Sequence, residues 1–182
     1  MSDELHNHLV EHLVHHAVRT DGPFTLASGE VSDFYIDARQ TTFDGYGAIL
    51  VGEAVLAALD PRVTAVGGMT MGADPIGVAT AIAGARARRP VNAFSIRKAA
   101  KDHGAGGRLV GPVSGDDVAA VVEDTTTTGA TLAEAVEVLT DAGIEVVQAI
   151  ALVDRSGGKA EARLADAGVP LVTLVELGEL AL

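Results

Sequence analysis

From residue 63 to residue 175 the sequence alternates between short apolar stretches and longer segments in which apolar residues recur with helical spacing. The apolar stretches lie at 63–68, 91–96, 118–123, 144–154 and 171–175. The stretch VAAVVE at 118–123 is almost continuously apolar, which is typical of a strand that is covered on both faces. Because strands that alternate with helices form parallel sheets, the region predicts an α/β fold with helices on both faces of the sheet.

Helices are predicted between these strands, at 75–87, 131–143 and 158–168. Asp74 and Pro75 are favourable residues for the N-cap and the first position of the first of these helices.

The first 40 residues do not follow the alternation. Residues 3–19 have the apolar spacing of an amphipathic helix, and residues 24–39 contain two short stretches of strand character. A further helix is predicted at about 44–59. We expect residues 1–182 to form a single domain in which residues 1–40 make a small cap, or hood, on the main sheet.

Histidines recur along the predicted N-terminal helix. His8, His12 and His15 fall opposite its apolar side, and His8/His12 and His12/His16 are spaced so that two imidazoles could bind one metal ion. Carboxylates do not complete such a set in this segment, so we predict that the histidines form an exposed polar face.

The composition disfavours several classes of function. The net charge of −12 disfavours binding to DNA, RNA or an anionic membrane, which attract clustered Lys and Arg. The absence of cysteine excludes disulfides, thiolate metal sites and cysteine nucleophiles. The polar N-terminus does not resemble a signal peptide, and no apolar run approaches the roughly 20 residues of a membrane span. We therefore expect a cytoplasmic protein.

The segment VVEDTTTTGAT at 121–131 joins an apolar strand to a predicted helix. Ligands of parallel sheets bind at the carboxyl ends of the strands, and the N–H groups and threonine hydroxyls of this turn would hold an anion there. Glu123 and Asp124 would repel a phosphate, but carboxylates bind sugar hydroxyls and hydrated Mg²⁺. The combination favours a ribose 5-phosphate site over an ordinary strand–helix turn capped by threonine.

A second polar segment, FSIRKAAKDHGAGG at 94–107, gathers positive charge in an acidic chain. Lys98 and Lys101 are two of only three lysines, and they lie beside Arg97 and His103. We predict that residues 97–117 form a long, glycine-punctuated connection. A mobile basic loop suits a pyrophosphate leaving group, on which negative charge builds during the reaction. The alternative is a solvated surface loop.

These segments resemble the motifs of a known family. VVEDTTTTGAT resembles the signature with which type I phosphoribosyltransferases bind phosphoribosyl pyrophosphate (PRPP), and RKAAKDHGAGG is similar to the RKxxKxHGxGG loop of orotate phosphoribosyltransferases. FTLASGEVSDFYID resembles the orotate-side segment of these enzymes, and VGGMTMGADPIGVA resembles their pyrophosphate loop and following helix. The resemblance, which extends from about residue 24 to residue 155, implies a type I phosphoribosyltransferase-like parallel sheet flanked by helices, with an N-terminal hood.

The resemblance also implies roles for individual residues. Glu123 and Asp124 would bind the ribose hydroxyls, and Lys101, His103 and Asp124 would be catalytic. The pyrophosphate of PRPP would contact Arg97, Lys98, Lys101 and His103, together with the pyrophosphate loop Thr70, Met71, Gly72, Ala73 and Asp74. The 5-phosphate would contact Thr125, Thr126, Thr127, Thr128, Gly129, Ala130 and Thr131. The orotate contacts would be Phe34, Tyr35, Thr127 and Arg155. From its position alone, Arg155 could equally be a surface ion-pair partner.

The activity implied by the resemblance is Mg²⁺-dependent transfer of the 5-phosphoribosyl group from PRPP to orotate, which gives orotidine 5-monophosphate and pyrophosphate in pyrimidine (UMP) biosynthesis. Mg²⁺ would be bound mainly through PRPP and water near Glu123 and Asp124, without direct protein ligands. The resemblance further implies a homodimer in which residues 97–108 of one chain reach the site of the other. The chain departs from the family at Ala27, where some members have lysine, so any contact of that lysine is absent or supplied elsewhere.

Two alternatives remain at this point. A purine phosphoribosyltransferase would accept a purine and would not need the RKxxKxHG segment. A non-catalytic regulator that senses PRPP and binds RNA or DNA is disfavoured by the net charge of −12 and by the intact basic segment.

Overall fold

The computed structural model describes residues 1–25, 31–101 and 107–180. Its helices are α1 (Asp3–His16), α2 (Arg39–Thr42), α3 (Gly45–Ala58), α4 (Ala73–Arg86), α5 (Ala130–Asp141), α6 (Lys159–Asp166) and the 3-10 helix η1 (Leu177–Leu180). Its strands are β1 (Val18–Arg19), β2 (Phe24–Thr25), β3 (Val31–Ser32), β4 (Tyr35–Ile36), β5 (Ala65–Met69), β6 (Asn92–Lys101), β7 (Gly107–Val110), β8 (Val118–Thr126), β9 (Glu145–Asp154) and β10 (Leu171–Glu176).

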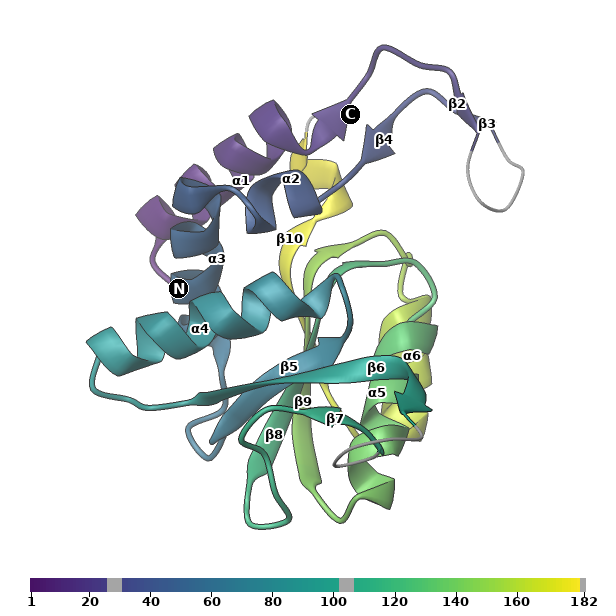
Figure 1. Cartoon of the computed structure of the whole chain (residues 1–182). Coiled ribbons are helices and arrows are strands. Elements are labelled where there is room, and N and C mark those ends of the chain that lie inside the picture. Colours follow the sequence, from purple (N-terminus) through teal and green to yellow (C-terminus); the bar gives the residue numbers. More distant parts are fainter. Residues whose placement is uncertain (26–30, 102–106, 181–182) are drawn as a thin grey trace.

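Six of these strands form the main sheet, in the order β10-β9-β8-β5-β6-β7. All neighbouring pairs are parallel except β6 and β7, which are antiparallel at one edge (Figure 1). The predicted α/β class and parallel sheet are therefore confirmed. Because the strands are parallel, the ends of β5 and β8 that carry the predicted binding motifs meet at the same edge of the sheet.

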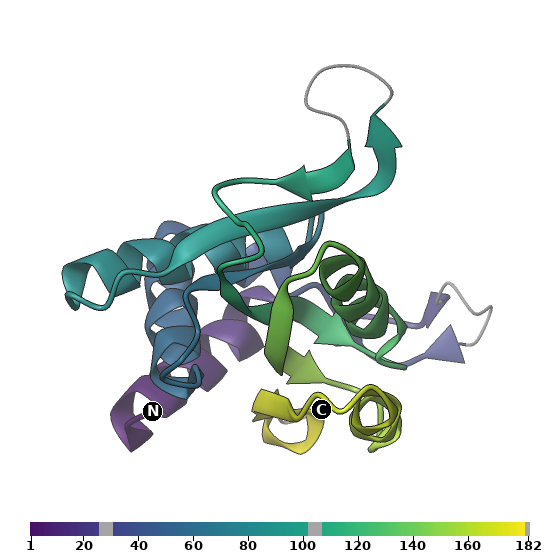
Figure 2. The same cartoon turned by 90° about the horizontal axis from the view of Figure 1, so that it is seen from below.

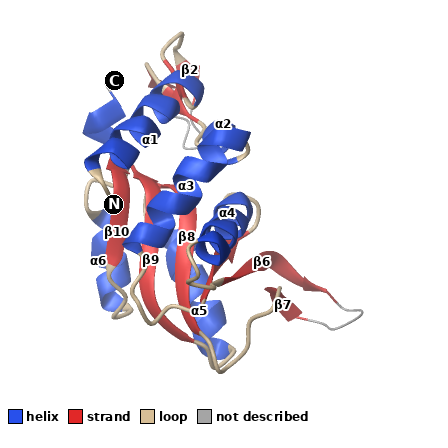
Figure 3. Cartoon of the chain, turned by 90° about the vertical axis from the view of Figure 1, so that its left-hand side faces the viewer, coloured by secondary structure: helices blue, strands red, loops and turns tan. Residues whose placement is uncertain are grey.

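Alternating side chains of the central strands enter two separate cores. Val66 and Val122 belong to the core beneath α1, α3 and α4, whereas Ala65 and Val121 belong to the core beneath α5 and α6. Figure 3 shows α1, α3 and α4 together on one side of the sheet. The strands are apolar on both faces for this reason, as the near-continuous apolar stretch in β8 predicted.

The N-terminal segment packs at one end of this sheet. Helix α1 lies against α3 and β10, and two small antiparallel ladders, β1 with β4 and β2 with β3, extend beyond it (Figure 1). The expectation that residues 1–40 act as a hood stays a prediction.

The prediction that His12 lies on an exposed polar face is wrong. His12 is buried, and its ring nitrogens lie 3.2 Å from the Thr41 hydroxyl and 3.1 Å from the Asp44 carboxylate. The ring also stacks on His16, with centroids 4.2 Å apart. Asp44 accepts from the N–H groups of Tyr46 and Gly47 at the start of α3, so the imidazole is held by the residue that caps the neighbouring helix.

Two predicted element boundaries also need correction. Helix α4 begins at Ala73 with Gly72 as its N-cap, so Asp74 lies inside the first turn and its carboxylate accepts from the Thr70 hydroxyl. Residues 97–117 are not simply a connection: β6 continues to Lys101, and β7 returns antiparallel to it. Figure 2 shows this hairpin projecting from the body of the chain.

Within the part of the chain that the structure describes, none of the helices has both the length and the apolar character needed to cross a membrane.

Gly67 of β5 is expected to be essential for the spacing of the central strands. A Cβ atom at this position would collide with the carbonyl oxygen of Phe94 on β6 and would lie 2.8 Å from its ring. Gly67→Ala should therefore lower the free energy of unfolding by about 2–4 kcal/mol. Gly45→Ala is the control, because a Cβ there meets nothing within 4 Å, and it should change stability by less than about 1 kcal/mol. Equal effects of the two substitutions in urea unfolding would contradict this account.

Candidate active site

Glu123 and Asp124 lie near the carboxyl end of β8, which continues further than the sequence indicated. Thr125 and Thr126 are still strand residues, paired with Val153 and Asp154 of β9. The predicted turn is therefore shorter and begins only after Thr126. β8 pairs with β5 up to Val121 and with β9 through Thr126, so the two carboxylates follow directly on the doubly paired part of a central strand.

A cavity of about 540 Å³ opens at this edge of the sheet. Its lining joins residues from α2, β5, the β5–α4 turn, the start of α4, β6, β8 and α5. They are Arg39, Met69, Thr70, Met71, Gly72, Ala73, Lys98, Val122, Glu123, Asp124, Thr131 and Glu134. Eight of the residues predicted to contact PRPP are among them: Thr70, Met71, Gly72, Ala73, Lys98, Glu123, Asp124 and Thr131. The acid pair and the pyrophosphate loop, which are about 50 residues apart in the chain, therefore form one pocket.

The pyrophosphate loop lies directly against the acid pair. A Cβ atom at Gly72 would lie 2.6 Å from an oxygen of Asp124, so a side chain there would displace this carboxylate. The Thr70–Met71 peptide is cis. The Thr70 hydroxyl donates to Asp74 at 2.7 Å, which places the Asp74 carboxylate behind the loop rather than among the residues lining the cavity.

The turn that follows β8 is organised by its own side chains. The Thr126 hydroxyl is buried and accepts from the Gly129 N–H at 3.1 Å, and the Thr128 hydroxyl accepts from the Ala130 N–H at 3.3 Å. Gly129 has a φ of +71°, and a Cβ there would lie 2.8 Å from Ala160. Thr126 therefore shapes the turn from within instead of presenting its hydroxyl to a ligand.

The backbone of the same turn is open to an anion. Neither the Thr127 N–H nor the Thr128 N–H donates a hydrogen bond to any residue that the structure describes. Both precede the first turn of α5, which begins at Ala130. Free amides at a helix N-terminus stabilise a phosphate group.

Burial dominates the electrostatics of the acid pair. It raises the pKa of Glu123 to about 7, and nearby Thr131 and Thr126 only partly oppose this effect. Burial also raises the pKa of Asp124, while the Thr125 N–H, which donates to it at 2.9 Å, and the charge of Arg39 act in the opposite direction. One oxygen of Glu123 is buried without a hydrogen-bond partner among the described residues. The site therefore contains carboxylate oxygens whose partners a ligand can supply.

Arg97 and Lys98, two of the predicted cations, are consecutive residues of β6, so their side chains lie on opposite faces of the strand. Lys98 lines the cavity, whereas Arg97 is not among the lining residues and its carbonyl oxygen accepts from Arg108 at 2.7 Å. Arg108 also forms an ion pair with Glu134 of α5, which joins the base of the hairpin to the cavity wall. Lys101 is the last residue of β6. His103, the fourth predicted cation, lies outside the described residues. Ala27, where the chain departs from the family, also lies outside them.

The residues predicted to contact orotate lie apart from the cavity lining. The Arg155 guanidinium carbon is 5.3 Å from the centre of the Phe34 ring, and its Nε is buried without a partner in the described structure. The Arg155 N–H donates to the Thr126 carbonyl at 2.8 Å, which ties the arginine to the end of β8. Tyr35 instead packs against Phe24, with ring centroids 5.9 Å apart. Phe34 and Arg155 therefore come together, whereas Tyr35 does not join them.

Sequence reasoning missed four residues that line the cavity: Arg39, Met69, Val122 and Glu134. Met69 and Val122 lie within the quoted motifs, directly before the predicted contacts Thr70 and Glu123, and could have been included by extending those sets of contacts one residue. Arg39 belongs to the N-terminal segment, and only the tertiary arrangement brings it to the acid pair. Among the residues described, no group of three or more His, Cys, Asp or Glu side chains is arranged to bind a metal ion.

Comparisons with known proteins agree with this geometry. No protein-family model matches the chain. The curated orotate phosphoribosyltransferase of Streptomyces avermitilis is 43% identical over 181 residues, which cover 99% of each protein. The chain belongs to the orotate phosphoribosyltransferase family. The members of this family are pentosyltransferases. The similarity, which the motifs indicated for residues 24–155, covers nearly the whole sequence.

Solved structures support the same assignment. The orotate phosphoribosyltransferase of Mycobacterium tuberculosis in complex with Fe(III) dicitrate has a TM-score of 0.84 at 36% identity, and the match covers 98% of this chain and 99% of that one. The same M. tuberculosis enzyme in complex with PRPP has a TM-score of 0.81 at 31% identity, with 98% and 99% coverage. These neighbours confirm the type I phosphoribosyltransferase fold.

The raised pKa of Glu123 predicts a specific pH dependence of stability. Its pKa is about 7 in the folded chain against an ordinary value of 4.5, so the folded state retains a proton that the unfolded chain loses. The stabilisation is complete below about pH 4.5 and is lost as the pH rises to about 7. The wild type should therefore lose on the order of 1–3 kcal/mol relative to Glu123→Gln across this range. Urea unfolding of both proteins from pH 5 to pH 8 measures the difference, and a constant difference would contradict the assignment.

Proposed function

We propose that the protein is an orotate phosphoribosyltransferase that transfers the 5-phosphoribosyl group of PRPP to orotate, giving orotidine 5-monophosphate and pyrophosphate in pyrimidine biosynthesis. The observation that carries the proposal is the single cavity in which Glu123, Asp124, Lys98 and the Thr70–Ala73 turn meet. Its contents match two parts of PRPP: carboxylates for the ribose hydroxyls, and backbone with a cation for the pyrophosphate. The names of the relatives favour orotate over a purine as the acceptor.

The proposed reaction breaks the bond between C1 of the ribose and the pyrophosphate oxygen, and forms a bond between C1 and the ring nitrogen of orotate. The electron pair of the broken bond leaves with pyrophosphate, and the proton of the orotate nitrogen passes to solvent. Glu123 and Asp124 would orient the ribose, and the Thr127 and Thr128 N–H groups would hold the 5-phosphate. Lys98, Lys101 and His103 would stabilise the charge on the departing pyrophosphate.

Magnesium is expected to act with the substrate, and the residues present fit this role. One oxygen of Glu123, which lines the cavity, is buried without a hydrogen-bond partner among the described residues, and carboxylate oxygen and water are the ligands that Mg²⁺ prefers. Glu123 and Asp124 would hold the hydrated ion through water while PRPP supplies its direct ligands. When bound, the ion would neutralise part of the pyrophosphate charge. Removal of Mg²⁺ with EDTA should abolish turnover, and excess Mg²⁺ should restore it.

Orotate would bind beside Phe34 and Arg155. The Arg155 Nε has no described hydrogen-bond partner although it is buried, so a carboxylate of the acceptor would satisfy a donor that otherwise loses hydration. The Phe34 ring under the guanidinium provides an apolar surface for a flat base. A purine has no carboxylate for Arg155.

A homodimer is also proposed, on two observations. Helices α3 and α4 form an apolar groove of about 620 Å³, and Tyr46, Ile49, Val78 and Ile82 are about half exposed on these helices. Contiguous apolar surface of this kind favours a partner. The β6–β7 hairpin also projects from the main body of the chain (Figure 3). Residues 97–108 could therefore reach the active site of the other subunit. The cytoplasmic location expected from the sequence stays a prediction.

The activity is tested by mixing the protein with PRPP, Mg²⁺ and orotate and following the loss of orotate absorbance. We expect turnover with orotate and none with adenine, guanine or hypoxanthine in matched assays. Turnover with a purine and not with orotate would establish the purine alternative, and binding of PRPP without turnover of any base would favour a regulator.

Lys101→Ala should reduce kcat by at least about 100-fold without changing thermal stability, because the lysine is proposed to stabilise the leaving group and not the fold. Lys159→Ala is the control, because Lys159 begins α6 outside the cavity lining. Mixing Lys101→Ala chains with Asp124→Asn chains then tests the shared loop. Hybrids should regain activity at one of two sites if residues 97–108 cross between subunits, whereas mixtures that stay inactive would show that each loop serves its own chain.

A further inference from the structure

Arg39 is the cation that the N-terminal segment contributes to the cavity. It is the first residue of α2, and it lines the cavity together with Met71 and Asp124. The pKa of Arg39 is raised mainly by its hydrogen bonds to Asp37, and the negative charge of Asp124 contributes as well. The guanidinium therefore lies within electrostatic range of Asp124.

Asp37 fixes the orientation of this guanidinium. The Arg39 Nε donates to one oxygen of Asp37 at 2.7 Å, and Nη2 donates to the other at 3.2 Å. Gln40 donates to the same carboxylate at 3.2 Å, and the Arg39 N–H also donates to it. In the described structure Nη1 has no hydrogen-bond partner. One edge of the guanidinium is thus held, and the other is available to a ligand.

The charge of the cavity creates a need for this cation. Three carboxylates line it, those of Glu123, Asp124 and Glu134, and the last is paired with Arg108. A pyrophosphate group placed beside them would be repelled unless nearby cations outweigh the acids. Lys98 and Arg39 are the cationic residues among those that line the described cavity.

The neighbours of Arg39 identify which part of the substrate it would meet. Arg39 and Met71 also border a second hollow of about 620 Å³ beside the first, together with His16, Asp37, Gln40, Phe43 and Asp44. Met71 belongs to the pyrophosphate loop, whereas Phe34 and Arg155, which are proposed to hold orotate, are absent from both linings as described. Arg39 is therefore on the pyrophosphate side of the ribose.

We infer that Arg39 binds the pyrophosphate group of PRPP from within the same chain, and that Asp37 positions it for this contact. The inference rests on the proposed function and adds a residue to it. The leaving group would then lie between Lys98 of β6 and Arg39 of the N-terminal segment. Bidentate recognition of phosphate oxygens by a guanidinium is directional, so lysine would replace it only in part.

The two reaction products separate this contact from others. Pyrophosphate contains only the group that Arg39 is proposed to bind, and orotidine 5-monophosphate contains everything else. Isothermal titration with each product in the presence of Mg²⁺ should show that Arg39→Gln weakens pyrophosphate binding by about 10- to 100-fold and nucleotide binding by less than about threefold. In turnover assays the KM for PRPP should rise, while the KM for orotate stays nearly constant. Arg39→Lys should lie between the wild type and Arg39→Gln.

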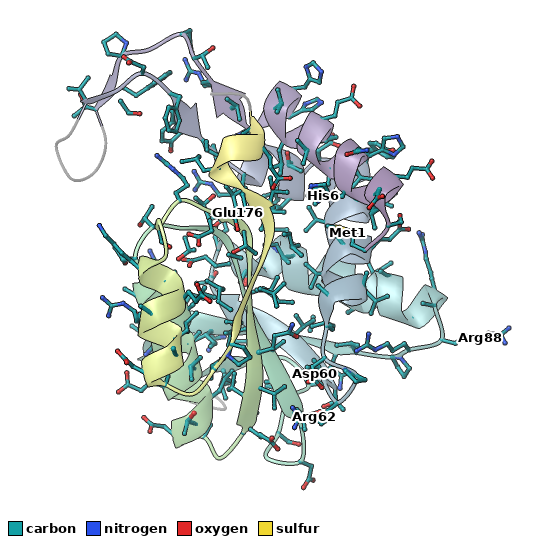
Figure 4. All side chains as sticks on the ribbon, turned by 180° about the vertical axis from the view of Figure 1, so that it is seen from behind. Met1, His6, Asp60, Arg62, Arg88 and Glu176 are labelled. Atoms are coloured by element: carbon teal, nitrogen blue, oxygen red, sulfur yellow. The ribbon has the colours of Figure 1, made fainter. Side chains whose placement is uncertain are left out.

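Arg62→Gln is a matched control. Arg62 pairs with Asp60 in the same way that Arg39 pairs with Asp37, two residues apart, with Nε and Nη2 donating to the two oxygens at 3.1 and 3.2 Å. Asp60 and Arg62 lie where the strands of the main sheet begin, whereas Glu176 lies where β10 ends (Figure 4). Arg62→Gln should leave both affinities unchanged.

Each outcome decides the inference. Unchanged pyrophosphate affinity in Arg39→Gln would overturn it, and an equal loss for both products would assign Arg39 to the general structure of the site. If Arg39→Gln fails to fold, the affinities of Arg39→Lys for pyrophosphate and for the nucleotide are compared instead. Wild-type pyrophosphate binding by Arg39→Lys would exclude a guanidinium-specific contact. Failure of the wild type to convert orotate would instead reject the proposed function, while a selective loss of pyrophosphate binding would still place Arg39 at that group.

Discussion

The carboxylates of Glu123 and Asp124 are withdrawn from water on a central strand, and the rest of the site is arranged around them. Burial raises the pKa of both groups, and neither forms an ion pair with any residue that the structure describes. Such groups cost folding free energy, and they persist where a ligand completes their hydrogen bonds. The sheet can tolerate this cost because β8 is paired on both sides and its neighbouring residues enter two well-formed cores. The same rigidity fixes the direction of both side chains.

The acidity of the chain does not prevent it from forming an anion site, because the relevant charges are local. The net charge is −12, yet the groups that face the cavity include Lys98 and Arg39, and two N–H groups before α5 have no described partner. These groups come from a strand, a short helix and a turn that are far apart in the sequence. A short Debye length at physiological salt screens distant acidic residues and preserves the contribution of those within the pocket.

The sequence was sufficient to predict features that depend on local spacing. The alternation of apolar and helical segments predicted the parallel sheet, and the acids after VAAVVE were placed at the carboxyl end of a strand by a general property of such sheets. It was insufficient wherever a neighbour outside the segment decides the outcome. Thr126 reads as part of a turn, but pairing with Asp154 extends β8 through it. His12 reads as part of a polar face, but Thr41 and Asp44 supply hydrogen-bond partners that allow it to be buried.

Arg39 shows the same limit at the site itself. In the sequence it is one arginine beside an aspartate, like Arg19 near Asp21 and Arg62 near Asp60, and the three pairs have similar hydrogen bonds. What distinguishes it is the ladder between β1 and β4, which positions the start of α2 next to a loop that belongs to the main sheet. The ion pair between Arg39 and Asp37 is a local product of the sequence, whereas the position of Arg39 in the cavity lining is a product of tertiary packing. The N-terminal segment therefore supplies the main-sheet cavity with one oriented guanidinium.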